Sequence, residues 1–536
     1  MNTEARRPNF LLFITDQQRW DHLGCTGNGV VRTPHIDGIA RRGVRFERFY
    51  TASPVCMPNR ATLMTGRLPS LHGVRTNGIP LSLRAATFVE LMRRAGYRTA
   101  LIGKSHIQNM VGPPPIYQPE RANGDPPPPE LAEAIMDDWS GAAYSQEIPK
   151  YWQDPKHDIA LPYYGFDHVE LSDEHGDQCF GHYTRWLAQR HKTPDRLMGP
   201  ENQLPGNTMT VPQAWRTAVP EELYPTFYVA ERTEAYLDAW AKGDRSRPFM
   251  VQCSFPDPHH PFTPPGRYWD MYDPADMPLP SAFDLGNAPP PPHVAALLAA
   301  RDAGTRADQR KNAFAINERE TREAIALTYG MITMVDDAVG RVLAMLKSLG
   351  LDRDTVVVFT ADHGDLMGDH QLLLKGPFAY RGLVQVPFLW ADPASPSRAG
   401  ATCPALCGTL DMAATFLDRA GIGAFNGMQG RSLVPLAEGR TTNGHDGVIV
   451  EYGMQYPFLG GRGMMTMRSL ITERWRITIY SGRDWGELYD LKADPDERFN
   501  LWDDRASAGI RAEMAERLAR AMMDHAETSP APTGRA

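Results

Sequence analysis

The sequence predicts an α/β fold in which helices cover both faces of a large mixed, mostly parallel sheet. Continuous apolar runs of strand length alternate with helical patterns along the chain, at residues 9–15, 99–103, 249–255, 355–360 and 386–390. Such alternation is typical of open sheets, whose ligands bind beyond the carboxyl ends of the strands. Polar residues follow four of these runs, namely Asp16, Lys104, His259 and Asp362. We therefore expect these four side chains to meet at one edge of the sheet.

Local signals place the helices and loops between the strands. Residues 85–95 and 318–349 have the apolar spacing of helices. The proline-rich stretches 112–129 and 278–292 are expected to be loops that run over the sheet. The segment 151–224 is dense in aromatic residues, glycine, histidine and proline, and it is long enough to form the rim or lid of a pocket.

The pattern changes near residue 427. Short strands and a closing amphipathic helix are predicted there, at residues 468–471, 476–480, 487–490 and 506–526. A chain of 536 residues exceeds the size at which single cores stop growing. We therefore expect a catalytic domain, 1–426, and a smaller α+β domain with an antiparallel sheet, 427–536.

Composition and charge limit the partners. The net charge of −8 disfavours a nucleic acid or an anionic membrane, so an anionic substrate has to be captured by local positive groups. Six cysteines form no disulfide-scaffold pattern. The apolar run that begins at residue 10 is too short for a signal peptide, and no segment approaches the length of a membrane span, so we expect a cytoplasmic protein.

Residues 51–67 carry the most distinctive chemistry. Pro58 suits a first helical turn, so we expect Cys56 at a helix N-terminus, where free N–H groups and the helix dipole favour negative charge. Arg60 lies one turn later on the same face. A cysteine, a positive helix end and a guanidinium together suit a tetrahedral oxyanion. A buried cysteine beside a surface arginine is the alternative for this segment alone.

Two strand ends carry potential metal ligands, Asp16 with Gln17 and Asp362 with His363. Either carboxylate alone could be a solvated strand-end residue or a helix cap. Brought together, however, the two carboxylates would repel each other unless a cation lay between them. The pattern therefore favours a divalent metal beside Cys56.

The segment Cys56-Met57-Pro58-Asn59-Arg60, followed by Leu63-Met64-Thr65-Gly66-Arg67, resembles the signature of the sulfatases, a branch of the alkaline phosphatase superfamily. Further similar motifs follow in order up to residue 501, among them Gly103-Lys-Ser-His106, Pro258-His-His-Pro261 and Glu487-Leu-Tyr-Asp-Leu491. The resemblance implies an alkaline phosphatase-like fold and hydrolysis of a sulfate monoester. It also implies that a formylglycine-generating or sulfatase-maturing enzyme oxidises Cys56 to formylglycine, whose hydrated aldehyde is the nucleophile.

The resemblance assigns one metal to the ligands Asp16, Gln17, Asp362, His363 and the modified Cys56. Many family members carry a second aspartate where this chain has Gln17. Ca²⁺ is the metal that the resemblance implies. Compared with those members, this site has one carboxylate fewer and one imidazole more, so its ligands are softer and Mn²⁺ is the alternative.

The resemblance also implies the catalytic roles. A metal-bound hydroxyl of hydrated formylglycine attacks sulfur in line, while the metal, Arg60, Lys104 and Lys375 hold the equatorial oxygens. His259 matches the histidine that protonates the leaving alcohol, and its neighbour His260 stays an alternative. His106 is the simplest base to remove the proton of the second hydroxyl, which breaks the sulfate ester and restores the aldehyde.

Other functions stay open. Phosphonate monoester hydrolases and phosphodiesterases of the same superfamily share the nucleophile motif and an Asp-Gln start, so Gln17 favours them, and Asn77 is compatible with an oxyanion contact in such enzymes. The motif that contains Lys104 and His106 favours a sulfatase instead. A protein whose Cys56 stays a thiol would bind a sulfated ligand without cleaving it. The leaving group could be an aryl, alkyl or sugar alcohol, and the proline-rich stretches and the last helix offer surfaces for self-association.

Overall fold

A nine-stranded mixed sheet forms the centre of the computed structural model, which describes residues 7–110, 128, 134, 139, 141–286, 288–306, 312–454 and 465–534. The strand order is β11-β2-β10-β8-β1-β6-β3-β4-β5. In chain order the strands are β1 (Asn9–Thr15), β2 (Val44–Tyr50), β3 (Arg98–Gly103), β4 (His168–Asp173), β5 (Phe180–Gly181), β6 (Phe249–Ser254), β8 (Thr355–Ala361), β10 (Phe388–Ala391) and β11 (Ala401–Gly408).

The central strand β1 pairs in parallel with β6 on one side and with β8 on the other. All five apolar runs predicted as strands are strands in the structure, and the mostly parallel sheet is confirmed. Strand β10 is an exception to the parallel direction, because it runs antiparallel to both β8 and β2. Strands β2, β4, β5 and β11 were not predicted; β2 alternates apolar and charged residues instead of forming a continuous apolar run.

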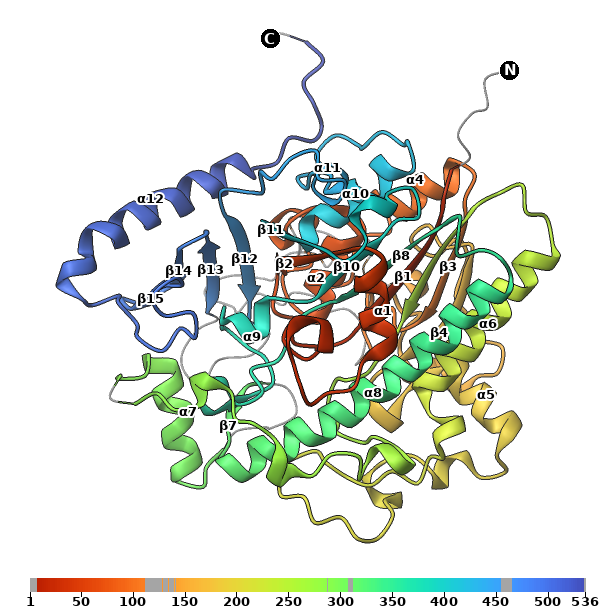
Figure 1. Ribbon diagram of the computed structural model, residues 1–536, viewed down its shortest axis with the longest axis horizontal. Helices are drawn as coiled ribbons and strands as arrows, with labels where there is room; N and C mark the ends of the chain where they lie inside the picture. The colour runs from red at the N-terminus through yellow and green to blue at the C-terminus, as the bar shows by residue number, and fades with distance from the viewer. Residues whose placement is uncertain are drawn as a thin grey trace.

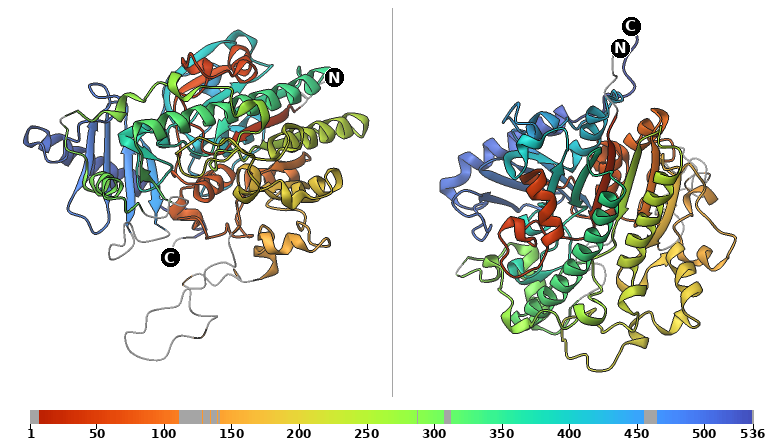
Figure 2. Two further views of the ribbon diagram at one scale, coloured as in Figure 1. Left: turned by 90° about the horizontal axis from the view of Figure 1, so that it is seen from below. Right: turned by 45° about the vertical axis from the view of Figure 1, so that its right-hand side comes forward.

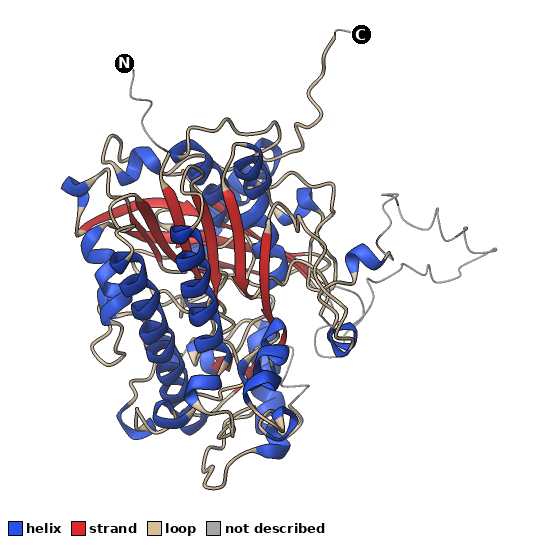
Figure 3. Cartoon of the chain, turned by 90° about the vertical axis from the view of Figure 1, so that its right-hand side faces the viewer, coloured by secondary structure: helices blue, strands red, loops and turns tan. Residues whose placement is uncertain are grey.

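Helices cover both faces of this sheet (Figure 3). Side chains alternate along a strand, so Leu11 and Phe13 of β1 pack into one apolar cluster, while Phe10, Leu12 and Ile14 pack into another. The first cluster includes α1 (Pro34–Arg42), α5 (His182–Arg190), α6 (Pro225–Lys242) and α8 (Glu318–Ser348). The second includes α2 (Cys56–Thr65), α4 (Phe88–Arg94), α10 (Met412–Arg419) and α11 (Val434–Ala437).

The longest helix, α8, lies beside α6 on the first face (Figure 2). Asn317 and Glu320 form a capping box that fixes its start, and the predicted helices at 85–95 and 318–349 correspond to α4 and α8. Short helices complete the chain: α3 (Pro69–His72), α7 (Pro292–Asp302) and α9 (Arg381–Val384). Among the described residues, no helix combines the length and the apolar composition needed to cross a membrane.

The loop predictions have mixed outcomes. Of the stretch 112–129 only Pro128 lies among the described residues. Of the stretch 278–292, residues 278–286 and 288–292 are described, and they are irregular apart from one short 3₁₀ turn and the first residue of α7. The segment 151–224 is more than a rim, because it contributes β4, β5 and α5. A two-stranded sheet of β7 (Phe314–Ala315) and β9 (Leu372–Leu373) lies outside the main sheet.

A separate antiparallel sheet follows near the C-terminus, formed by β12 (Val448–Gly453), β13 (Thr466–Ile471), β14 (Trp475–Tyr480) and β15 (Gly486–Asp490). Helix α12 (Ala508–Asp524) lies along this sheet (Figure 1), and its residues Met514 and Leu518 pack on Ile449, Ile477 and Leu488. Three of the four strands and the closing helix agree with the sequence pattern. The domain boundary at 426/427 stays a prediction.

Candidate active site

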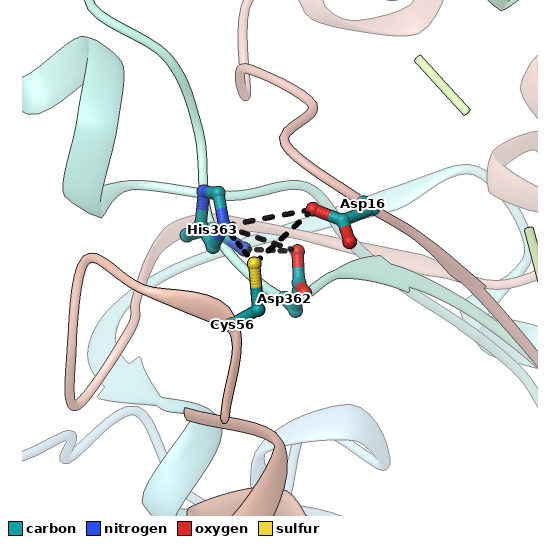
Figure 4. Close-up of side chains that lie close together, drawn as sticks. All are labelled: Asp16, Cys56, Asp362 and His363. Carbon is teal, nitrogen blue, oxygen red and sulfur yellow. Dashed lines mark hydrogen bonds and ion pairs between the residues drawn. The ribbon is translucent and has the colours of Figure 1, made fainter. Parts of the chain in front are cut away.

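The carboxyl ends of β1, β3, β6 and β8 and the N-terminus of α2 converge on one buried cluster. In Figure 4 the sulfur of Cys56 points into the space beside Asp16, Asp362 and His363. One potential ligand atom from each of these four residues lies within 4.8 Å of the others. The structure thus brings together side chains that lie at widely separated positions in the sequence.

Cys56 is the first residue of α2 and is only 1% exposed. Its Sγ lies 3.1 Å from His363 Nε2, 3.1 Å from Lys375 Nζ and 3.7 Å from Asp16 Oδ1. Asn77 supports this helix end, since its Oδ1 accepts a hydrogen bond of 3.1 Å from the backbone N–H of Met57. A nucleophile at position 56 therefore faces an imidazole, an ammonium and a carboxylate.

Both carboxylates are fully buried, and each lies beside hydrogen-bond donors or positive charges. The backbone N–H groups of Gln17 and His363 donate to Asp362 Oδ1, at 3.1 and 2.8 Å, while Arg60 Nε donates to Asp362 Oδ2 at 2.8 Å. Burial acts to raise the pKa of Asp16, but the positive charge of Lys104, the largest opposing cause, holds it well below its usual value. Asp16 is therefore a carboxylate despite being fully buried.

The donor set fits a divalent cation. His363 Nδ1–H donates to the Gly364 carbonyl oxygen at 2.8 Å, which leaves the lone pair of Nε2 directed at the cluster. Burial, followed by the charge of Lys375, lowers the pKa of His363, so the imidazole is neutral. Gln17 Nε2 donates to Asp365 Oδ2 at 2.5 Å, and Gln17 Oε1 is buried without a hydrogen-bond partner among the described residues. Two carboxylates, one imidazole and one unpaired amide oxygen are suitable ligands for such an ion.

Three positive side chains surround the cluster. Lys104 Nζ lies 2.5 Å from Asp16 Oδ2; burial acts to lower its pKa, but Asp16 raises it above the usual value. Lys375 Nζ lies 3.1 Å from His363 Nε2 and 2.8 Å from His259 Nε2. Arg60 binds the Lys104 carbonyl oxygen at 3.1 Å and Ser254 Oγ at 3.0 Å, so it also joins the ends of β3 and β6.

The turn that carries Lys104 depends on a close backbone approach. Gly103 has a φ of +105°, and a Cβ there would lie 1.9 Å from the Ser254 carbonyl oxygen. Only glycine therefore lets β3 approach β6 closely enough at this point. The approach sets the place where the Lys104 side chain enters the site.

The predicted histidines occupy different positions. His259 faces Lys375, whereas the Nδ1 of His260 lies 3.0 Å from Gln17 Nε2. His106 is buried, and burial together with Lys104 holds its pKa well below the usual value. No contact among the described residues joins His106 directly to Cys56.

Sequence reasoning missed His175 and Asn59. His175 Nε2 contacts Lys104 Nζ and lies 3.7 Å from Asp16 Oδ2. It follows the carboxyl end of β4 by two residues, so the strand-end rule would have found it had β4 been recognised. Asn59 joins α2 to β8, because its Nδ2 donates to the Asp362 carbonyl oxygen and its Oδ1 accepts from the Ala52 N–H.

The chain is similar to proteins of known families over most of its length. The family model described as Sulfatase matches residues 8–111 and 163–422, and the model described as N-sulphoglucosamine sulphohydrolase, C-terminal, matches residues 368–524. An arylsulfatase of Clostridium perfringens is 29% identical over 503 residues, which cover 92% of this chain and 90% of the relative.

Two further similarities involve the wider superfamily. A multifunctional alkaline phosphatase superfamily protein of Trinickia caryophylli is 28% identical over 546 residues, which cover 97% of this chain and 96% of the relative. The crystal structure of a phosphonate monoester hydrolase of Agrobacterium radiobacter superposes with a TM-score of 0.74 and 27% identity, over 98% of this chain and 97% of that one.

Proposed function

The chain belongs to the sulfatase family of the alkaline phosphatase superfamily and is a sulfatase enzyme, and we propose that it cleaves an aryl or alkyl sulfate monoester to alcohol and sulfate, with residue 56 supplying the nucleophile. The observation that carries this proposal is the set of cations around Cys56. Lys375 Nζ lies 3.1 Å from Sγ, and Lys104 Nζ and Arg60 Nη2 lie 2.5 and 3.6 Å from Asp16 Oδ2. Such a set suits the three non-bridging oxygens of a sulfuryl group.

Asp16, Gln17, Asp362 and His363 would hold the divalent cation, which we propose to be Ca²⁺, with Mn²⁺ as the alternative. Together with formylglycine made from Cys56, the bound cation would supply a hydroxyl of lowered pKa as the nucleophile. Arg60 positions Asp362 and the start of the Lys104 turn through the hydrogen bonds given above. Lys104 and Lys375 bind the sulfuryl oxygens and neutralise charge as it develops on them.

His259 and His106 handle protons in this proposal. His259 Nδ1 donates to the His260 carbonyl oxygen, so Nε2 is the ring nitrogen that faces Lys375. Nε2 accepts a proton from the Lys375 ammonium and passes it to the oxygen of the departing alcohol, which leaves Lys375 as a neutral amine until solvent reprotonates it. His106 would accept a proton when sulfate is released; burial and Lys104 lower its pKa, so its imidazole is neutral before that step but is a weak base.

A phosphonate monoester hydrolase or phosphodiesterase is the second candidate. Gln17 favours it, as does the similarity to the phosphonate monoester hydrolase structure. The cationic Lys104 and the neighbouring His106 favour the sulfate ester instead. A protein that keeps Cys56 as a thiol and only binds sulfated ligands is a third possibility, from a different class.

The deciding experiment compares an aryl sulfate with an aryl phosphonate that has the same leaving group. The enzyme is purified from a host with a formylglycine-generating enzyme, and peptide mass spectrometry measures the conversion of Cys56. We expect the sulfate to have the higher kcat/KM and activity to scale with the converted fraction.

The control pair for this experiment consists of two buried cysteines. Cys56→Ala removes the nucleophile, so kcat should fall by about 10⁴-fold or more. Cys403→Ala alters a free cysteine on β11 and should leave kcat unchanged. A higher kcat/KM for the phosphonate, or full turnover by Cys56→Ala, would refute the proposal.

A further inference from the structure

Two stacked imidazoles connect the two lysines of the site. Lys375 Nζ lies 2.8 Å from His259 Nε2, and the His259 ring lies against the His175 ring with 3.4 Å between centroids and 13° between planes. His175 Nε2 in turn contacts Lys104 Nζ. The contacts therefore run without a gap from Lys104 through His175 and His259 to Lys375.

The hydrogen-bonding capacity of Lys104 shows why such a connection matters. An ammonium group has three N–H donors and a flexible four-carbon stem, and ordering that stem costs rotamer entropy. The ammonium of Lys104 lies against Asp16 Oδ2, 2.5 Å away, in one direction and against His175 Nε2 in another; Nε2 accepts from it in the tautomer that carries the ring proton on Nδ1. With these two directions fixed, the third donor has a single direction left.

His175 is itself well placed to hold Lys104. It follows β4, which pairs in parallel with β3, the strand that precedes Lys104. Stacking on His259 fixes the plane of the His175 ring, and Glu174 Oε1 lies 3.8 Å from its Nδ1. The side chain is 12% exposed, whereas those of Lys104 and Asp16 are fully buried, so His175 lies on the solvent side of the pair.

We propose that His175 is a positioning residue that orients Lys104 toward the sulfuryl oxygens and, through its stack on His259, couples Lys104 to Lys375. The proposal rests on the sulfatase function above and deepens it. An acceptor at position 175 fixes the ammonium of Lys104, and the stacked ring keeps that acceptor in place. Substitution should therefore impair the chemical step more than substrate binding.

Two variants separate the stacking of the His175 ring from its role as a hydrogen-bond acceptor. His175→Phe keeps a flat ring for stacking but loses the acceptor, and we expect kcat to fall about tenfold to a hundredfold with a smaller change in KM. His175→Gln keeps an acceptor and should recover part of this loss. His168→Phe alters the first residue of β4, the strand that precedes His175, and should leave kcat unchanged. Melting temperatures and Cys56 conversion are measured for every variant.

A double-mutant cycle tests whether His175 acts through Lys104. In a Lys104→Ala background, His175→Phe should change kcat by no more than about twofold, because the side chain that it orients is gone. Independent, multiplying losses would refute the proposal, as would a His175→Phe enzyme with the wild-type kcat.

A binding measurement gives a readout besides turnover. Inorganic sulfate should raise the melting temperature of the wild type more than that of His175→Phe, since ligand binding stabilises the native state. Equal shifts would count against the proposal. If the wild type cleaves the phosphonate and not the sulfate, the sulfatase function fails, and the same kcat ratios on the phosphonate then decide the role of His175. If it cleaves neither, the sulfate-induced shifts decide that role.

Discussion

Beneath the site, two buried carboxyl groups hold the turn that carries Lys104 and His106. Asp173 Oδ1 accepts from the backbone N–H of Ser105 at 2.8 Å, and Glu147 Oε2 accepts from that of Gln108 at 3.0 Å. Burial is the main reason why the pKa of Glu147 rises to about 8 and that of Asp173 to about 6. Glu147 also lies near Asp173, whose charge raises its pKa further.

The raised pKa of Glu147 predicts a pH effect on stability. Its folded-state pKa exceeds the usual value of 4.5, so its contribution to stability is present at low pH and is lost as the pH rises toward about 8. Glu147→Gln removes this titration, and its free energy of unfolding should fall less than that of the wild type between about pH 5 and about pH 8. Urea unfolding at both pH values measures the difference. Glu473→Gln, on an exposed side chain, should keep the wild-type slope.

Single site residues could be predicted where the strand that precedes them was itself predicted. Asp16, Lys104 and Asp362 directly follow β1, β3 and β8, so the rule that ligands bind at carboxyl ends located them. His175 was missed because β4 carries a histidine and a glutamate among its apolar residues. Asn59 was missed for another reason: its partners are backbone groups of distant segments, and no local pattern indicates which backbone groups a buried amide will meet.

Between elements, a buried arginine joins the C-terminal sheet to the segment that carries Lys375. Arg476 of β14 binds Glu487 of β15 at 3.0 Å and also contacts Glu497. Glu497 accepts a hydrogen bond of 2.6 Å from the backbone N–H of Arg381, the first residue of α9. The hydroxyl of Tyr480 on β14 donates to the carbonyl oxygen of Pro377, at 3.1 Å. The small sheet thus fixes the backbone just after Lys375.

Breaking this ion cluster should destabilise the protein strongly. Arg476→Met leaves two buried carboxylates without their cation, so the free energy of unfolding should fall by about 3–5 kcal/mol. Arg474→Met removes the ion pair of an exposed arginine with Asp490 on the same hairpin and should lower the free energy of unfolding far less than Arg476→Met does. Urea unfolding compares the two variants. Equal losses would mean that Arg476 acts only as a surface charge does.

Element directions were harder to predict than element positions. The apolar run that became β10 identified a buried strand, but nothing in it specifies whether the strand runs parallel or antiparallel. The connection does not decide it either, because residues 362–387, which include β9 and α9, are long enough for a parallel crossover. Strand β2 was missed because its charged residues alternate with apolar ones on a partly exposed face.

Across the whole molecule, the proposed metal ligands come from the two ends of a long chain segment. The backbone of Gln17 and the side chain of Asp362 are hydrogen-bonded although 345 residues separate them in sequence. A cation bound by Asp16 and Asp362 would therefore join the first strand to β8. The overall architecture was predictable from strand and helix alternation, whereas the domain boundary, cytoplasmic location and self-association stay predictions.

Metal removal should lower the stability of the whole chain. A cation at a hundred times its Kd stabilises the native state by about 2.7 kcal/mol, so dialysis against a chelator should lower the Tm. Re-addition of Ca²⁺ or Mn²⁺ then shows which ion restores it at the lower concentration. Asp16→Asn should make the Tm insensitive to the chelator. Asp337→Asn, in the more exposed cluster with His35 and Asp336, should leave the chelator effect unchanged. A wild-type Tm that does not change after dialysis against the chelator would contradict the metal assignment.

The burial of Cys56 limits the time during which a modifying enzyme could oxidise it. Once β8 and Lys375 have closed over α2, the thiol is 1% exposed and no modifying enzyme can reach it. Lys375 lies 319 residues after Cys56 in sequence. At a synthesis rate of about 5–20 residues per second, the ribosome needs roughly 15 to 60 s to add that length. The proposed conversion of Cys56 to formylglycine would therefore have to occur before translation and folding are complete, and slower elongation should yield a larger converted fraction.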